Sequence, residues 1–186
     1  MIQPGMLKYS YLAHLSQPAA DRQIYRAIRR HPVCSIVELG VGYARRAQRM
    51  IAVASRFQPD AEIHYTGVDL FEGRPDDDPG ITLKLAYTML KRLGARIRVI
   101  PGDPFTALAR KANSLTDTDL LVIAADQDPD ALSCAWPFVP RMIHGNSLVF
   151  LEQSDGDRGT SRFKRLERQE IDELAGMVSR RNRLAA

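Results

Sequence analysis

The stretch Ser35-Ile-Val-Glu-Leu-Gly-Val-Gly-Tyr43 holds the features that decide the fold. Its first part, up to Leu39, is rich in branched apolar residues, which is typical of a buried strand. Gly40 and Gly42 follow, and a helical pattern begins after them, so the stretch predicts a strand that turns sharply into a helix. Glycine permits positive φ and leaves the backbone uncovered, while the N–H groups that open the next helix offer unpaired donors. We therefore expect a nucleotide-type ligand at this turn.

The glycine spacing differs from that of a dinucleotide-binding turn. That fingerprint is Gly-x-Gly-x-x-Gly or Ala, and its sixth position is Arg45 here, a bulky side chain where helix and strand should pack closely. A nicotinamide-dependent dehydrogenase is therefore the third-ranked interpretation. A strand-to-helix turn that binds no ligand is a further alternative, since short glycine motifs occur by chance.

Length and composition predict one soluble globular domain. The chain has 186 residues, of which 45% are hydrophobic and 26% charged, and no apolar run is long enough to span a bilayer. Met1 to Gly5 show no basic segment that leads into an apolar one, so we expect no secretory signal. Two cysteines are too few for a disulfide framework, which favours free thiols in a reducing cytoplasm.

The net charge of +4 leaves a polyanionic partner open. Along the sequence, however, the basic residues are spread over several predicted helices and mixed with acids. No arginine-rich stripe with interleaved aromatic residues stands out, so a nucleic-acid partner is not expected.

Four further strands are predicted after the first, each separated from the next by a helical pattern. They cover residues 63–70, 96–101, 119–125 and 147–152. This alternation predicts a doubly wound α/β fold with a mainly parallel sheet in the order 3-2-1-4-5. The expected organisation is an N-terminal helical segment at residues 1–32, the α/β domain at 33–153, and a loop and helix at 154–186.

Acidic side chains follow three of these strands, at the edge where ligands gather in open α/β sheets. Asp69 ends the second strand and is placed to accept both hydroxyls of a ribose. Asp103 follows the third strand, and Asp126 follows the fourth. The alternative for each acid is a loop position or the N-cap of the next helix.

Together these features resemble class I S-adenosylmethionine-dependent methyltransferases over roughly residues 33–153. The residues Glu38-x-Gly-x-Gly-x-Ala44 are similar to the first motif of that family, and the acids follow in the family's order. The resemblance implies that Asp103 accepts a hydrogen bond from the adenine amino group and that Pro104 or Phe105 packs against the ring. The full set of cofactor-binding residues that it implies is Glu38, Gly40, Gly42, Asp69, Leu70, Gly102, Asp103, Pro104 and Phe105.

The end of the fourth strand departs from the metal-dependent catechol-type O-methyltransferases. In those enzymes the comparable run ends Asp-Ala-Asp-His, whereas here Ala124 takes the place of the first acid and Gln127 that of the histidine. The acidic run Asp76–Asp78 reads as a solvated loop, because consecutive acids cannot all point at one ion. No metal site is therefore expected, and Asp126 is the candidate catalytic base.

The region after Glu152 also departs from the family. Class I methyltransferases normally add an antiparallel hairpin of two strands here, but these residues are polar and helical in pattern. We predict a loop at Ser154–Ser161 and a helix at Arg162–Leu184, without the usual hairpin. The fifth strand would then form an unpaired sheet edge, which favours a homodimer through this region.

The resemblance implies metal-independent transfer of a methyl group from S-adenosylmethionine to an oxygen or nitrogen of a small molecule. A sulfonium methyl is already electrophilic, so positioning supplies most of the acceleration. The alternative is a catalytically inactive methyltransferase-like protein with a binding or regulatory role. The missing hairpin, Ala124 and the absence of a Pro-Pro-aromatic motif favour that alternative.

Overall fold

The computed structural model describes residues 5–75, 80–155 and 160–184. The helices are α1 (Met6–His14), α2 (Asp21–Arg30), α3 (Arg45–Phe57), α4 (Leu83–Lys91), α5 (Pro104–Lys111), α6 (Pro129–Ala135) and α7 (Arg168–Leu184). The strands are β1 (Ser35–Leu39), β2 (His64–Asp69), β3 (Arg96–Pro101), β4 (Thr118–Ile123), β5 (Ile143–Asp155) and β6 (Thr160–Leu166). Short 3-10 helices are η1 (Phe71–Gly73), η2 (Ala112–Ser114) and η3 (Trp136–Arg141).

One sheet of six strands forms the centre of the molecule, in the order β3-β2-β1-β4-β5-β6. The first five strands are parallel and β6 is antiparallel to β5. The predicted order 3-2-1-4-5 and the doubly wound α/β class are confirmed. Since β1 lies between β2 and β4, the turn after β1 is flanked by the ends of both neighbouring strands.

The sixth strand corrects the prediction for the end of the chain. Thr160–Leu166 pairs with β5 along its whole length, where the sequence predicted a loop and the start of a helix. Phe163 and Leu166 are buried, and the ring of Phe163 meets that of Phe150 edge to face at 6.4 Å between centroids. The spacing of three between these apolar residues resembled a helical face. Within the described residues, one antiparallel strand follows β5 instead of the family's two.

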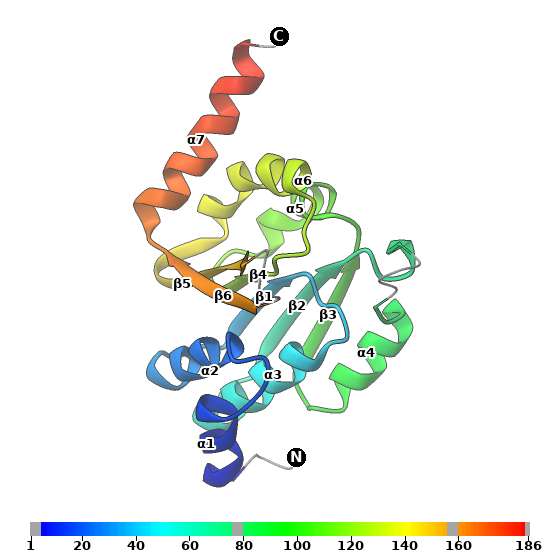
Figure 1. The fold of residues 1–186 in the computed structure, drawn as a ribbon, viewed down its shortest axis with the longest axis vertical. Coiled ribbons are helices and arrows are strands. Elements are labelled where there is room, and N and C mark those ends of the chain that lie inside the picture. Colours follow the sequence, from blue (N-terminus) through cyan, green and yellow to red (C-terminus); the bar gives the residue numbers. More distant parts are fainter. Residues whose placement is uncertain (1–4, 76–79, 156–159, 185–186) are drawn as a thin grey trace.

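Helices cover both faces of the sheet. Helices α1 to α4 lie on one side, and α5, α6 and the first half of α7 lie on the other (Figure 1). Alternate residues of β1 supply the two cores, because successive side chains of a strand point to opposite faces. Ile36 joins the core beneath α2 and α3, whereas Val37 and Leu39 join the core beneath α5 and η3.

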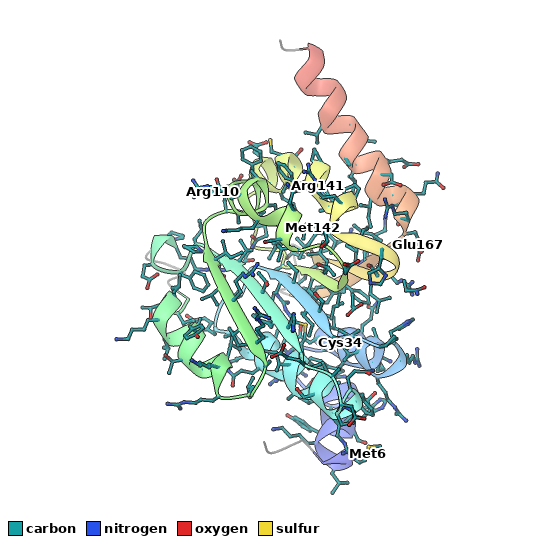
Figure 2. The ribbon with its side chains drawn as sticks, turned by 180° about the vertical axis from the view of Figure 1, so that it is seen from behind. Met6, Cys34, Arg110, Arg141, Met142 and Glu167 are labelled. Carbon is teal, nitrogen blue, oxygen red and sulfur yellow. The ribbon has the colours of Figure 1, made fainter. Side chains whose placement is uncertain are left out.

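The two ends of the described chain lie far apart on this scaffold. Seen from behind, Met6 on α1 lies at the bottom of the molecule, and Glu167, which precedes α7, lies well above it (Figure 2). Arg110 and Arg141 lie on the face that carries α5 and η3 (Figure 2). Helix α7 packs against η3 through Ile171 and then leads away from the body (Figure 1). Among the residues described, no helix is long and apolar enough to cross a bilayer.

Candidate functional site

The turn after β1 adopts the backbone conformation that its glycines allow. Gly40 has φ 92° and Gly42 has φ 53°, and Ala44, also left-handed at φ 56°, precedes the first residue of α3. A Cβ added to Gly40 would lie 2.6 Å from the Cβ of Ala124 and 2.5 Å from Nε2 of Gln127. Glycine is therefore required at position 40 by both backbone conformation and space.

Asp69 faces this turn, as the sequence predicted. Its Oδ2 accepts hydrogen bonds from the backbone N–H groups of Val41 at 2.7 Å and Gly42 at 2.8 Å. Its Oδ1 accepts a third bond from the N–H of Phe71 at 3.1 Å. Burial works to raise the pKa of Asp69, but the bonds from Arg74, Gly42 and Phe71 outweigh it and lower that pKa. The carboxylate at the end of β2 is therefore held in its ionised form against the turn.

Arg74 connects two of the acids that the sequence singled out. Its Nε donates to Oδ1 of Asp69 at 2.6 Å, and one terminal nitrogen donates to Oδ2 of Asp69 at 2.8 Å and to Oδ2 of Asp126 at 2.7 Å. Only 8% of the Arg74 side chain is exposed. We call this arrangement the Arg74 bridge. Gly80 lies against it, since an added Cβ there would be 2.9 Å from Cδ of Arg74.

The Arg74 bridge occupies the acceptor capacity that a ribose would need. Five N–H groups already donate to Asp69, whereas a carboxylate offers roughly four lone-pair sites. The hydroxyls of an adenosyl ribose can reach Asp69 only after Arg74 has moved away. The residues at this place fit an adenosine-type ligand in kind and position, and Arg74 competes with that ligand for the carboxylate.

No role for Arg74 is predicted from the sequence. The signal that could have identified it is charge. Arg74 is the only cation between Asp69 and Lys84, and the neighbouring acids Asp69 and Asp126 were already placed at one sheet edge. An arginine fork matches a carboxylate in two hydrogen bonds, so such a cation is the expected partner.

Asp103 caps α5, the alternative that the sequence left open. Its Oδ1 accepts from the N–H of Thr106 at 2.9 Å and its Oδ2 from the hydroxyl of Thr106 at 2.7 Å. Desolvation is the largest single influence and acts to raise the pKa of Asp103, but the hydrogen bonds from Thr106 and from nearby backbone N–H groups together outweigh it and lower that pKa. Gly102, with φ 131°, donates from its N–H to the backbone oxygen of Asp69 at 2.9 Å. Asp103 therefore lies at the same sheet edge as Asp69, and its contact with adenine stays a prediction.

The apolar residues predicted to line the cofactor differ in exposure. Pro104 is buried as the first residue of α5. Leu70 is 44% exposed and Phe105 is 43% exposed, and the Phe105 ring lies 6.0 Å from that of Phe138 between centroids. Two open apolar side chains thus follow β2 and β3, where the sequence placed the adenine.

Glu38 lies in a different environment from the one predicted. It is fully buried, its Oε1 accepts from Nε of Arg46 at 2.7 Å, and its Oε2 accepts from the hydroxyl of Tyr65. Burial raises the pKa of Glu38 even though Arg46 and Tyr65 act to lower it. Glu38 therefore supports the site from below, through Arg46, and does not line the space above the turn.

Arg46 is the second arginine whose role sequence reasoning missed. Besides Glu38 it pairs with Glu152 at 3.0 Å and with Asp21 at 3.6 Å, and it donates to the backbone oxygen of Gly40 at 3.3 Å. Burial raises the pKa of Asp21, whose Oδ1 has no hydrogen-bond partner within the described part of the chain. Nothing in the sequence near Arg46 marks it, because its partners come from α2, β1 and β5.

A hollow of about 340 Å³ lies above the glycine turn. Its lining residues are Pro18, Asp21, Gly40, Val41, Gly42, Tyr43, Arg45, Arg46, Ala124, Ala125, Asp126 and Glu152. Asp126 stands at this hollow with 39% of its side chain exposed, and its Oδ1 accepts from Nε2 of Gln127 at 2.8 Å. The structure therefore brings Gly40, Gly42, Asp69 and Asp126 together, while Asp103 and its neighbours lie after the next strand, β3, at the start of α5.

The residues that the structure describes contain no group of three or more His, Cys, Asp or Glu side chains able to hold a metal ion. Asp76, Asp77 and Asp78, interpreted from the sequence as a solvated loop, lie outside the described residues.

No family model and no curated protein matches this sequence. Among solved structures, the chain is similar to a proposed rRNA methylase from Clostridium thermocellum, with TM-score 0.55, 11% identity, and coverage of 89% of this chain and 82% of that one. It is also similar to a proposed caffeoyl-CoA O-methyltransferase from Staphylococcus aureus, with TM-score 0.54, 14% identity, and coverage of 92% and 74%. An S-adenosylmethionine-dependent methyltransferase from Agrobacterium tumefaciens gives TM-score 0.51 at 14% identity, over 85% of this chain and 50% of that one. The chain therefore has the Rossmann-like fold of class I S-adenosylmethionine-dependent methyltransferases.

Proposed function

We propose that this protein binds S-adenosylmethionine at the glycine turn and transfers its methyl group to a small-molecule acceptor without a metal ion. The observation that carries the proposal is the position of Asp69, whose carboxylate faces the N–H groups of Val41 and Gly42 at the central edge of the sheet. An acid opposite a bare glycine turn is the arrangement that an adenosyl ribose requires. The fold and the strand order support the same ligand.

The bound cofactor would supply an electrophilic methyl group, and the protein would supply its position. Asp69 would hold the ribose, and Asp103, each of whose oxygens accepts one bond from Thr106, would use a remaining lone pair to accept from the adenine amino group. Leu70 and Phe105 would offer apolar surface to the ring. Gly40 and Gly42 would let the ligand approach the backbone, which helps to align it with the hollow.

Asp126 is the proposed general base, for acceptors that must lose a proton. It stands at the hollow, but in the Arg74 bridge its Oδ2 accepts a charge-assisted hydrogen bond. That bond occupies one oxygen of Asp126, so the guanidinium must leave before this oxygen can contact a substrate. Departure of Arg74 would therefore free both the ribose-binding acid and the base.

The size of the hollow supports a compact acceptor. At about 340 Å³ it lies near the lower end of ligand pockets, which span roughly 300–1,000 Å³. An oxygen or nitrogen nucleophile on a small molecule would fit there beside Asp126. The proposal covers methyl transfer to either an oxygen or a nitrogen atom.

An inactive binding protein is the second candidate, and the Arg74 bridge is the observation that favours it. Arg74 saturates Asp69 and pairs with Asp126 at the same time. If that bridge persists, neither acid is available to ligand or substrate. The two candidates differ in whether S-adenosylmethionine displaces Arg74.

Calorimetric titration of the protein with S-adenosylmethionine and S-adenosylhomocysteine tests the proposal. We expect binding by the wild type and a loss of about tenfold or more in Asp69→Asn, because a hydrogen bond to a charged group is removed. Asp117→Asn, the same change at an exposed position before β4, is the matched control and should bind as the wild type does.

Three outcomes of this titration have different meanings. No binding by the wild type removes the cofactor claim. Binding without formation of S-adenosylhomocysteine across a panel of small acceptors favours the inactive protein. Equal affinity of Asp69→Asn and Asp117→Asn would remove Asp69 from the site, provided that both variants melt cooperatively.

A cytoplasmic location and a homodimer are proposed from the sequence. The sequence predicts the dimer from an unpaired edge of β5. Because β6 pairs with β5, the outer edge of β6 is the surface to consider instead. Light scattering after size-exclusion chromatography at micromolar concentration tests the dimer, and a monomer at every concentration would dismiss it.

A further inference from the structure

The positive charge of this protein is concentrated in its first third. Residues 1–59 contain nine Lys or Arg and only two acids, Asp21 and Glu38, both of which are buried. The remaining residues contain seventeen Lys or Arg and twenty acids. Along the whole sequence the basic residues are mixed with acids, but the charged residues exposed on α1, α2 and α3 are all cations. Such a surface attracts anions.

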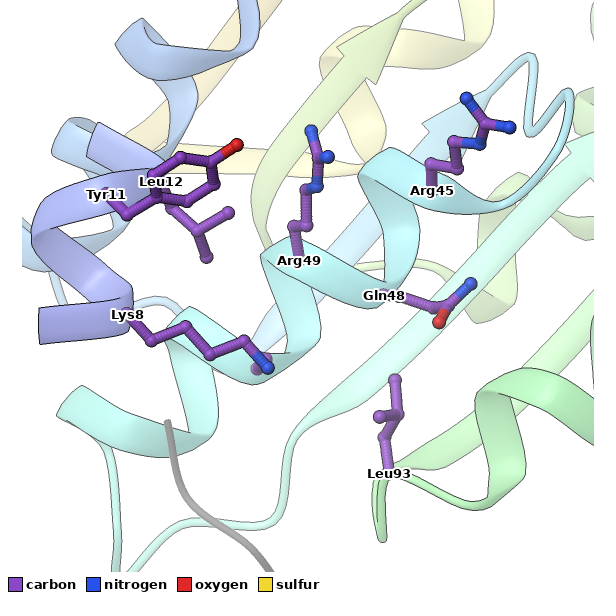
Figure 3. Close-up of a pocket in the computed structure, with 8 residues that line it drawn as sticks. Lys8, Tyr11, Leu12, Arg45, Gln48, Arg49 and Leu93 are labelled. Carbon is purple, nitrogen blue, oxygen red and sulfur yellow. The ribbon is translucent and has the colours of Figure 1, made fainter. Parts of the chain in front are cut away.

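Part of this surface is a groove between α1 and α3, which has a volume of about 340 Å³. Lys8, Tyr11 and Leu12 line it from α1, and Arg45, Gln48, Arg49 and Ala52 line it from α3. The charged ends of Lys8, Arg45 and Arg49 lie apart from one another along this space (Figure 3). All the charged residues in its lining, as far as the structure describes the chain, are cations. We call this space the basic groove.

The basic groove and the hollow above the glycine turn share one lining residue. Arg45 lines both spaces, and its guanidinium lies 5.9 Å from the ring centroid of Tyr43, which also lines the hollow. Tyr43 is 51% exposed and Tyr11 is 52% exposed. A molecule lying in the groove could therefore extend past Arg45 and place its other end above Gly40.

We propose that the basic groove binds the phosphate of a small phosphorylated acceptor, whose nucleophile reaches the hollow above Gly40. This inference rests on the proposed methyl transfer and names the substrate class for it. Arginine forks and a lysine ammonium are the side chains that bind phosphate oxygens, and Gln48 adds a neutral amide donor. The two exposed tyrosines offer ring faces to an organic part of the same molecule.

The extent of the groove favours a small phosphate ester over a nucleic-acid strand. A strand needs a track of cations along its backbone. Here Lys8, Arg45 and Arg49 line one space of about 340 Å³, which can hold a small phosphate ester. Arg49 also donates from Nη1 to the backbone oxygen of Gln17 at 2.6 Å, so Lys8 and Arg45 are the two cations whose substitution tests the proposal. Arg29, from the same basic surface, is instead stacked over Tyr9 at 5.2 Å and Phe57 at 5.8 Å.

Inorganic pyrophosphate is the probe for this proposal, in calorimetric titrations at low and at moderate salt. We expect Lys8→Gln and Arg45→Gln to weaken its binding at least tenfold each. Arg110→Gln removes the same charge from an exposed position on α5, on the opposite face, and should leave binding unchanged (Figure 2). Lys8→Glu, at an exposed position, should abolish binding, and thermal melts confirm that each variant folds.

Equal weakening in all variants, Arg110→Gln included, would show a general charge effect and overturn the proposal. Binding of a ten-nucleotide single strand by a protein that ignores pyrophosphate would overturn it in favour of nucleic acid. Titration with S-adenosylmethionine separates this inference from the proposed function. If the wild type binds that cofactor but not pyrophosphate, the groove assignment alone fails. If it binds pyrophosphate but not the cofactor, the proposed function fails instead.

Discussion

Two arginines border the glycine turn, and they differ in what holds them. Arg46 lies on α3, is 14% exposed, and pairs with acids from three other elements. Arg74 follows the 3-10 helix η1 and pairs with the acids at the ends of β2 and β4. Arg46 holds the fully buried Glu38 beneath the turn, together with Asp21 and Glu152, which line the hollow. Arg74 instead holds Asp69, the acid proposed to bind the ribose. We infer that Arg46 maintains the site and that Arg74 closes it.

Removal of Arg46 should have the largest effect. In Arg46→Met, Glu38 and Asp21 would remain buried without their cation, and the free energy of unfolding should fall by about 3–5 kcal/mol. Urea denaturation measures this change. Arg45→Met, one residue away on the exposed side of α3, should change stability by only about 0.5 kcal/mol. If Arg46→Met and Arg45→Met lower the free energy of unfolding by similar amounts, Arg46 does not have the structural role inferred for it.

Removal of Arg74 should lower the free energy of unfolding less than removal of Arg46 does. It should also strengthen the binding of S-adenosylmethionine. Arg74→Gln frees the oxygens of Asp69 for a ribose, and the affinity for S-adenosylmethionine should rise by about tenfold, in line with roughly 1.5 kcal/mol for a hydrogen bond to a charged group. The control is Arg92→Gln, at the exposed end of α4. Weaker binding by Arg74→Gln than by the control would make Arg74 a ligand contact and contradict its role as a competitor.

The smallest expected effect is on the pH dependence of stability. Its sign should be opposite for Asp21, a partner of Arg46, and for Asp69, a partner of Arg74. The pKa of Asp21 is raised by burial, so its contribution is fully present below its unfolded pKa near 3.8 and is lost as the pH rises through the folded pKa. The pKa of Asp69 is lowered, so its contribution is present above pH 3.8 and is lost as the pH falls through the folded pKa.

Urea denaturation of Asp21→Asn and Asp69→Asn between pH 3 and 7 tests these signs, each relative to the wild type. On acidification the wild type should gain stability relative to Asp21→Asn and lose it relative to Asp69→Asn. The same sign for both variants would contradict the distinction between the two arginine sites.

The parts of this structure that the sequence predicted are those governed by local pattern. The order of the first five strands follows from alternating strand and helix periods, and the meeting of Asp69 with Gly42 follows because parallel strands end at one edge. The cap at Asp103 was an alternative from the outset, because Asp-Pro is a common helix start.

The parts that escaped prediction depend on partners that are distant in the sequence. Arg46 and Glu152 are 106 residues apart, and nothing local distinguishes Arg46 from Arg45. Strand β6 has little apolar alternation of its own, and the unpaired edge of β5 provides its hydrogen bonds. Tertiary context therefore decided which arginine was buried and which segment became a strand.

Strand β6 has one consequence beyond completing the sheet. The hydroxyl of Ser161 donates to Oε1 of Glu152 at 2.6 Å, and the ring of Phe163 lies 5.3 Å from the guanidinium carbon of Arg46. Neither residue lines the hollow, yet each holds a side chain that does. A chain truncated after Asp155 would keep every predicted cofactor contact and still lose the two restraints that orient Glu152 and Arg46. The arrangement of side chains around the turn after the first strand thus depends on residues more than a hundred positions downstream.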